Sequence, residues 1–175
     1  MRQPYTTKTL PFKSNIVDAK DSVINAVDYD LGRNNYAYYD KDTGNYYISG
    51  GSRSAGNKGG LYRNDGVDIY KDSAHYESYY IGSIEDSEWV KYTTNVKQSL
   101  LYKLKMNVAS TTAGAVSVYL DDKLILDQKE IAATGTDKNW QTQTIGNIQL
   151  NNGSHAIRIY FNKGGFNLKQ LIFVK

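Results

Sequence analysis

The sequence predicts an all-β fold, a two-sheet antiparallel β-sandwich of the jelly-roll type. Short runs of alternating or β-branched residues recur along the chain, and clusters of Gly, Asn and Asp separate them. No segment carries a helical period over ten residues. Many short strands with turn signals between them are typical of a sandwich or jelly roll. The clearest runs are residues 22–29, 78–84, 88–95, 101–109, 115–120, 123–127, 141–149, 155–161 and 167–174.

The run 116–120 shows the strand pattern most clearly. Its even-numbered positions are apolar, and its odd-numbered positions are Ser117 and Tyr119, which is the period of two expected for a strand with one face in water. The next three residues, 121–123, predict a tight connection to the following strand. The Asn-Asn-Gly sequence at 151–153 predicts a hairpin turn before the following strand.

The length of 175 residues suits a single domain with one core. We expect residues 1–20 to form a lead-in strand or linker, and residues 21–175 to form a single module. The segment 32–66 is rich in Gly, Asn and Tyr and cannot bury a core of its own. It is therefore expected to form a long ordered loop on one edge of the sandwich.

Composition and charge exclude several classes of protein. The net charge is +3, without the basic run that tracks a phosphate backbone, so nucleic acid is not an expected partner. The chain has no Cys, which excludes disulfides and thiolate chemistry. No apolar stretch reaches the ~20 residues needed to span a bilayer, and the N-terminus lacks an apolar leader. The protein is either cytoplasmic or, as we prefer, exported, with its signal peptide and neighbouring domains outside this sequence.

Several short motifs occur in a characteristic order and spacing. They are INAVDYDLG at 24–32, AYYD at 37–40, NKGGLYRNDGVDI at 57–69, IGSIEDSEWVKYTTNV at 81–96, WQT at 140–142, LNNGSHAIRI at 150–159 and GGFNL at 164–168. In this order they resemble the family 6 carbohydrate-binding modules, from Pro11 to the C-terminus. The resemblance implies a galactose-binding-like jelly roll appended to a secreted glycoside hydrolase. It also implies a glycan-binding cleft in the loops at one end and, in some members, a second cleft on a sheet face.

The expected sugar site is centred on Trp140. A sugar ring presents an apolar C–H face and a fringe of hydroxyls, so it needs an aromatic platform with Asn, Asp or Arg side chains nearby. Trp140 lies in the polar loop TGTDKNW and matches the family's stacking Trp, and Asn167 matches its sugar-binding Asn. Asp137, in the same loop as Trp140, is a further candidate for the sugar hydroxyls. The resemblance places Trp89 in the core instead.

The second ring of the expected cleft is missing from its usual place. The family's cleft holds a sugar between the loop Trp and an aromatic residue whose position is taken here by Ser83. Either Ser83 makes room for a bulkier sugar, or a ring comes from the tyrosines of the long loop: Tyr36, Tyr39, Tyr46 and Tyr47. A single platform predicts weak binding, with a dissociation constant of roughly 0.1–1 mM. The alternative is a structural or adhesion sandwich that keeps the fold but has lost the sugar cleft.

The resemblance also implies a structural calcium ion, but its usual acidic ligands are absent. Their positions hold Asn25, Val27 and Lys169, whereas calcium needs several oxygen ligands with carboxylates among them. Lys169 is a candidate to replace the ion as a fixed positive charge. A separate candidate for a calcium site is Asp40 with Asp42, in a loop that has oxygen ligands at alternate positions.

No catalytic arrangement is evident, so we expect a binding protein rather than an enzyme. Glycosidase chemistry needs two carboxyl groups that face each other across about 5–10 Å, whereas the acids here lie in polar turns. The two histidines, His75 and His155, belong to no Ser-His-Asp order or metal-ligand cluster. The expected partners are an attached glycoside hydrolase domain and a polysaccharide or oligosaccharide of the agar/porphyran-type galactan, β-glucan or xylan class. We expect a monomer that is secreted, periplasmic or on the cell surface of a bacterium.

Overall fold

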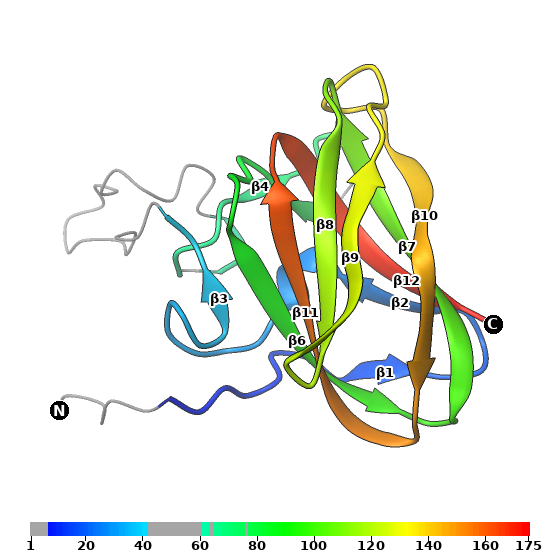
Figure 1. Cartoon of the computed structure of the whole chain (residues 1–175). Helices are drawn as coiled ribbons and strands as arrows, with labels where there is room; N and C mark the ends of the chain where they lie inside the picture. The colour runs from blue at the N-terminus through cyan, green and yellow to red at the C-terminus, as the bar shows by residue number, and fades with distance from the viewer. Residues whose placement is uncertain (1–6, 42–60, 64, 76) are drawn as a thin grey trace, which may run out of the picture.

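Two six-stranded sheets pack face to face in the computed structural model, which describes residues 7–41, 61–63, 65–75 and 77–175 (Figure 1). The strands are β1 (Asn15–Val17), β2 (Ser22–Asn25), β3 (Tyr38–Tyr39), β4 (Ile69–Lys71), β5 (Tyr79–Ile81), β6 (Trp89–Val96), β7 (Leu100–Ser110), β8 (Gly114–Leu120), β9 (Lys123–Ile131), β10 (Gln141–Leu150), β11 (Gly153–Lys163) and β12 (Phe166–Val174). The first sheet has the order β1-β6-β11-β8-β9, with β3 beside β6. The second has the order β10-β7-β12-β5-β4, with β2 beside β12. Every strand pair is antiparallel except β1–β6.

The predicted two-sheet sandwich is confirmed, and each of the nine predicted strands corresponds to β2 or to one of β5–β12. The prediction for β2 is wrong beyond Asn25, because the chain turns there into a 3-10 helix, η1 (Ala26–Asp28). β3 and β4 are not predicted, since two or three residues are too few to show an alternating pattern. In the described part of the chain, no helix is long and apolar enough to cross a membrane.

The core lies between the two sheets and consists of side chains at alternate positions of the long strands. In β7 these are Tyr102, Leu104 and Met106, all fully buried. They share one apolar cluster with residues of β11 such as Ile157 and Ile159. Burying one such side chain contributes about 1.5–3 kcal/mol, so this layer is the main source of stability.

A β-bulge in β12 changes which side chains face outward. The pairing of β12 with β7 shifts between Leu168 and Gln170, so Lys169 is the extra residue. Lys169 and Gln170 both lie on the outer face, whereas Leu168 before them and Leu171 after them are buried. The strand therefore keeps apolar residues in the core on both sides of the bulge.

A buried arginine attaches the segment before β4 to the rest of the sandwich. The Arg63 guanidinium donates hydrogen bonds to the backbone carbonyls of Tyr29 and, at 3.0 Å, of Asp30. It also forms a 2.9 Å ion pair with Asp65 and lies 3.7 Å from the centre of the Tyr29 ring. A buried cation is costly unless oxygen atoms surround it, so these contacts fix the approach of the chain to β4.

Two turns pack against each other at the end of the sandwich drawn uppermost in Figure 1, which we call the loop end. The Gly165 N–H donates to the Ile84 carbonyl at 2.9 Å, and the Gly164 N–H donates to the Asp86 carboxylate at 2.8 Å. A Cβ atom at position 164 would lie 2.1 Å from the Ile84 carbonyl oxygen. The contact between the two turns therefore requires glycine there.

We expect Gly164→Ala to lower the free energy of unfolding by about 1–3 kcal/mol, because the new methyl group displaces a backbone carbonyl. Denaturant unfolding followed by circular dichroism measures the change. Gly146→Ala is the control: its Cβ meets the flexible Leu126 side chain at 2.9 Å, so a smaller loss is expected. Equal stability of Gly164→Ala and the parent would contradict the close packing of the two turns.

Candidate functional site

Three aromatic side chains form a row on the outer face of the second sheet, near the loop end. The Tyr80 ring is edge-on to Trp140 at 5.2 Å between ring centroids. It also stacks on Tyr70 at 5.6 Å, with 18° between the ring planes. Tyr70 and Tyr80 are paired directly across β4 and β5, and Trp140 ends the loop before β10. We call Trp140, Tyr80 and Tyr70 the aromatic row.

Glycine at position 82 lets the Tyr70 ring lie across the end of β5. A Cβ atom on Gly82 would lie 2.9 Å from Tyr70 Cδ2 and 3.0 Å from Asn167 Oδ1, so the ring and the amide share the space over this glycine. The Tyr70 hydroxyl is 2.8 Å from Ser83 Oγ. An aromatic ring therefore does lie beside Ser83, and Tyr70 supplies it from the neighbouring strand.

A lysine covers one face of Trp140. The Lys169 ammonium lies 4.2 Å from the centre of the Trp140 ring and forms an ion pair with the Asp72 carboxylate. Desolvation raises the pKa of the Asp72 carboxyl, but hydrogen bonds with Lys169 and His75 outweigh this effect and lower the pKa to about 2. The ion pair is therefore intact at neutral pH and holds the ammonium over the indole.

Hydrogen-bonding groups border the aromatic row. Asn167 Nδ2 donates to the Asp137 backbone carbonyl at 2.9 Å, which ties β12 to the loop that carries Trp140. The Asp137 side chain is exposed. The pKa of Tyr80 is raised mainly because its hydroxyl is partly buried, and secondly because the Asp137 carboxylate is close to it. The Trp140 indole N–H has no hydrogen-bond partner among the described residues. A carboxylate and an indole N–H are both able to bind sugar hydroxyls.

Four of the residues predicted for the site lie together at the loop end: Trp140, Asn167, Ser83 and Asp137. The tyrosines expected to supply the second ring lie elsewhere. Tyr39 pairs with Trp89 across β3 and β6 in the first sheet, and Tyr36 lies in the turn before β3. Neither ring contacts Trp140, so the structure does not bring them to this site. Tyr46 and Tyr47 lie outside the described residues.

The sequence did not predict Tyr70, Tyr80 or the position of Lys169. β4 and β5 have only three residues each, so neither shows a full alternating pattern. A signal was nevertheless present, because each tyrosine adjoins an apolar isoleucine in the sequence. Ile69 and Ile81 face the core, so the adjoining Tyr70 and Tyr80 must face outward. The signal for the bulge that turns Lys169 toward the indole was a change of phase, because two consecutive polar residues separate Leu168 from Leu171.

The residues around Asn25 do not fit the calcium site that the resemblance implies. The Asn25 amide donates to the Asp28 carboxylate at 3.2 Å, and the Tyr62 hydroxyl donates to the same carboxylate at 2.6 Å. Lys169, expected there as a replacement for the ion, lies over the aromatic row instead, and Gln170 contacts Asn25. A carboxylate that already accepts two hydrogen bonds is poorly available as a calcium ligand, and calcium needs several oxygen ligands.

The other calcium candidate rests on Asp40 and Asp42. Asp40 is buried, and its backbone N–H donates to Asn34 Oδ1 at 3.0 Å, whereas Asp42 lies outside the described residues. In the part of the chain that the structure describes, no three His, Asp or Glu residues are grouped as a metal ion would need. Calcium in this loop stays a prediction.

A second aromatic group lies on the outer face of the first sheet. The Arg158 guanidinium is 4.3 Å from the centre of the Tyr119 ring and 5.4 Å from that of Trp89. Tyr160 is edge-on to Tyr119. Trp89 is half-buried on this outer face, so its predicted place in the core is wrong. The sequence contained a signal for this position. Trp89 lies two residues before the polar Lys91 in β6, so the two side chains are expected on the same, outer face.

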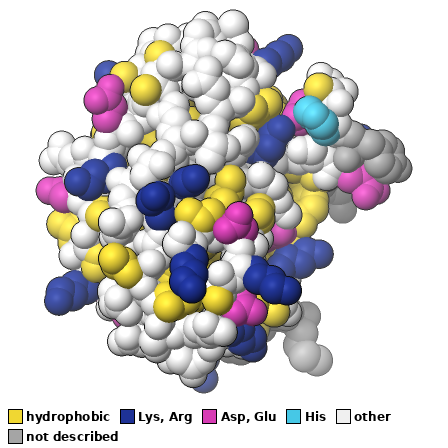
Figure 2. Space-filling model, turned by 90° about the vertical axis from the view of Figure 1, so that its right-hand side faces the viewer, with side chains coloured by type: hydrophobic (Ala, Val, Ile, Leu, Met, Phe, Trp, Pro, Cys, Tyr) yellow, Lys and Arg dark blue, Asp and Glu magenta, His cyan; other side chains and the backbone are white. Residues whose placement is uncertain are grey.

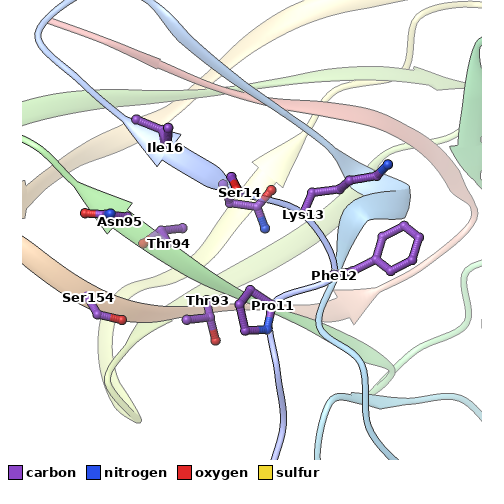
Figure 3. A pocket seen from close by; sticks show the side chains of 10 residues that line it. Pro11, Phe12, Lys13, Ser14, Ile16, Thr93, Thr94, Asn95 and Ser154 are labelled. Atoms are coloured by element: carbon purple, nitrogen blue, oxygen red, sulfur yellow. The ribbon is translucent and has the colours of Figure 1, made fainter.

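A hollow of about 640 Å³ lies between the lead-in and β6 (Figure 3). The Phe12 ring points away from the β6 side chains and packs 4.5 Å from the Arg63 guanidinium. The hollow therefore lacks the free aromatic platform of the aromatic row. Six of its ten lining residues carry hydroxyl or amide side chains: Ser14, Asn15, Thr93, Thr94, Asn95 and Ser154.

Sequence comparison gives one family. The family model described as "Carbohydrate binding module (family 6)" matches residues 61–175, which is more than half of the chain. A search of curated protein sequences gives no match.

Three solved structures are similar in fold. The C-terminal family 6 module of LamC, a laminarinase from Zobellia galactanivorans, is 21% identical, with a TM-score of 0.57 over 89% of this chain and 100% of that one. CsCBM6-3 from Clostridium stercorarium, solved with cellobiose, is 21% identical, with a TM-score of 0.55 over 90% and 95%. A family 43 arabinoxylan arabinofuranohydrolase from Bacillus subtilis, solved with cellotetraose, is 19% identical, with a TM-score of 0.57 over 93% and 28%. These likenesses support the two-sheet fold, and the family model shows that the chain belongs to the family 6 carbohydrate-binding modules.

Proposed function

We propose that the chain binds a polysaccharide or oligosaccharide at the aromatic row and does not itself catalyse a reaction. The observation that carries the proposal is the ring contact between Trp140 and Tyr80, with Asn167 and Asp137 beside it. The apolar C–H faces of a sugar stack on aromatic rings, and its hydroxyls bind amide, carboxylate and indole N–H groups. All of these groups meet at the loop end.

The aromatic row suits an extended sugar chain better than a single enclosed ring. Lys169 covers one face of Trp140, so at most one face of the indole is available to a sugar. Tyr80 and Tyr70 continue the apolar surface across β5 and β4. Each stacked ring contributes about 0.5–1.5 kcal/mol beyond the area it buries. An open row of this kind is consistent with weak binding, roughly 0.1–1 mM.

The acids with a raised pKa have structural partners, which supports a role without catalysis. Desolvation raises the pKa of Glu88, whose carboxylate accepts hydrogen bonds from the backbone N–H groups of Glu85 and Lys41. Desolvation also raises the pKa of Asp30, which accepts hydrogen bonds from the N–H and hydroxyl of Thr93. Both carboxylates hold loops to β6 and neither borders the aromatic row.

The module is further proposed to hold an attached glycoside hydrolase on its polysaccharide, outside a bacterial cell, in the periplasm or on the cell surface. Two of the similar structures support this role. One is a module of a laminarinase, and the other is an arabinofuranohydrolase of which this chain matches 28%. Galactan, β-glucan and xylan remain the candidate ligands.

A structural or adhesion role is the second candidate. The small Ser83 side chain and the ammonium over Trp140 favour it, because both reduce the ring area that a sugar can contact. A glycan array without a hit, from a protein that unfolds cooperatively on heating, would favour this alternative.

Trp140→Ala is expected to lower the affinity for a bound oligosaccharide about tenfold, because it removes the end ring of the row. Isothermal titration calorimetry with oligosaccharides of agarose, laminarin, cellulose and xylan measures the loss. Tyr36→Ala, which removes a ring that is 40% exposed elsewhere, is the matched control and should bind like the parent. If Trp140→Ala binds like the parent while Trp89→Ala does not, the site lies on the outer face of the first sheet.

Gly82→Ala tests the arrangement without removing any ring. The new methyl group displaces the Tyr70 ring and the Asn167 amide, so we expect an affinity loss of about five- to tenfold. Gly146→Ala, which crowds only the Leu126 side chain, should bind like the parent. Parental affinity in a folded Gly82→Ala variant would mean that Tyr70 and Asn167 do not contact the ligand.

The Asp72–Lys169 ion pair predicts a specific loss of stability in acid. Because the pKa of Asp72 is lowered in the folded state, its contribution is complete above the unfolded value of about 4. That contribution is lost as the pH falls through about 2. The unfolding temperature of the parent should therefore fall more steeply between about pH 4 and pH 2 than that of Asp72→Asn. Asp122→Asn, in an exposed turn, should follow the parent; parallel curves for Asp72→Asn and the parent would contradict the role of the ion pair.

A further inference from the structure

The second sheet presents a face that is basic and rich in amides. Its strands β2, β7, β10 and β12 contain no Asp or Glu, although they carry Lys103, Lys105 and Lys169. Alternation with buried residues places all three lysines on the outer face. Six amide side chains share that face: Asn25, Asn107, Asn147, Gln149, Asn167 and Gln170.

Two of these lysines have no counter-ion among the described residues. Lys105 lies between Thr144 of β10 and Ile172 of β12, and the cross-strand neighbours of Lys103 are also uncharged. Neither forms an ion pair within the described chain, whereas Lys169 is paired with Asp72. Positive charges that are not neutralised by an ion pair raise the local concentration of anions. The charge of this face therefore suits an anionic partner.

The basic face is continuous with the aromatic row. Asn167 and Lys169 border the row, and the same strand continues beside Lys105 and Lys103 on β7. At 3.3 Å per residue, β12 extends about 23 Å beyond Asn167, which is long enough for several sugar units. Figure 2 shows Lys and Arg side chains recurring across the side of the molecule that carries β10, β7 and β12, with fewer Asp and Glu side chains among them.

The remaining groups on this face suit a sugar chain better than a nucleic acid. Amide side chains both donate and accept hydrogen bonds, as hydroxyl groups require. Val23 and Leu101 are 52% and 57% exposed and provide apolar contact for C–H faces. The outer face of these four strands has no aromatic ring or arginine on which a base could stack.

We propose that Lys103 and Lys105 bind acidic groups of a polysaccharide whose neutral sugar rings occupy the aromatic row. The inference rests on the proposed function and assigns the class of its ligand: a chain that carries sulfate esters or uronic carboxylates. Exposed ion pairs are weak, and each lysine is expected to contribute about two- to fivefold in affinity. The lysines therefore select among polysaccharides, while the rings supply the common part of the binding.

The test compares polymers that differ only in charge. A sulfated galactan is titrated beside its desulfated form, and a polyuronate beside its methyl ester. In about 20 mM salt the parent should bind at least one acidic form about five- to tenfold more tightly than its neutral counterpart. The advantage should shrink in about 500 mM salt, because salt screens exposed charges. The pair that shows the advantage distinguishes sulfate from carboxylate.

Lys103→Gln/Lys105→Gln should remove this advantage and leave binding of the neutral polymer unchanged. Lys123→Gln/Lys129→Gln, which removes the same charge from exposed positions on β9, should keep the advantage. Equal binding of acidic and neutral forms by the parent would overturn the inference while leaving the proposed function intact. Equal losses in the two double variants would overturn it too, as would equally tight binding of double-stranded DNA. If the parent binds none of these polymers, the inference is overturned, and the titrations with laminarin, cellulose and xylan oligosaccharides decide the proposed function separately.

Discussion

The position of the aromatic row depends on how the buried charge of Arg63 is satisfied. A guanidinium taken out of water needs oxygen atoms around it, and an unpaired one would cost several kcal/mol. Backbone carbonyls of the loop after β2 and the Asp65 carboxylate supply those oxygens, and the Phe12 ring lies 4.5 Å away. Three parts of the chain therefore meet at one side chain. Since β4 begins soon after it, these contacts also set where Tyr70 emerges on the second sheet.

The fold was predictable because long strands repeat their alternation many times. The runs around β7, β10, β11 and β12 agree with the structure to within two residues at either end, since each has nine or more positions and alternates between core and water over much of its length. Short elements offer no such repetition: β3 has two residues and was not found. The prediction for Trp89 was wrong although it lies in a long strand. The resemblance put it in the core, although its neighbours Val90 and Lys91 already placed it on the outer phase.

The candidate site was predictable only in part. Trp140 and Asn167 were found because the resemblance matched them one by one, whereas the ring beside Ser83 comes from another strand. That ring is placed by a cross-strand pair, a hydroxyl contact and the missing Cβ of Gly82. These three contacts cannot be predicted from the spacing of residues along the chain, because each joins positions that only the folded sheet brings together. The site is thus an open row of rings with a lysine over one face of Trp140, and not a clamp with one missing ring.

The bulge at Lys169 adds a side chain to the site without changing which residues of β12 are buried. Upstream of this residue, β12 presents Asn167 to solvent and buries Leu168; downstream, it buries Leu171 and Phe173. Deleting Lys169 would leave Leu168, Gln170 and Leu171 in regular alternation opposite the same residues of β7, so the leucines would stay buried and Asn167 would stay on the outer face. The bulge is therefore an insertion that belongs to the site: a strand without it would keep its core side chains and lose only the ammonium over the indole.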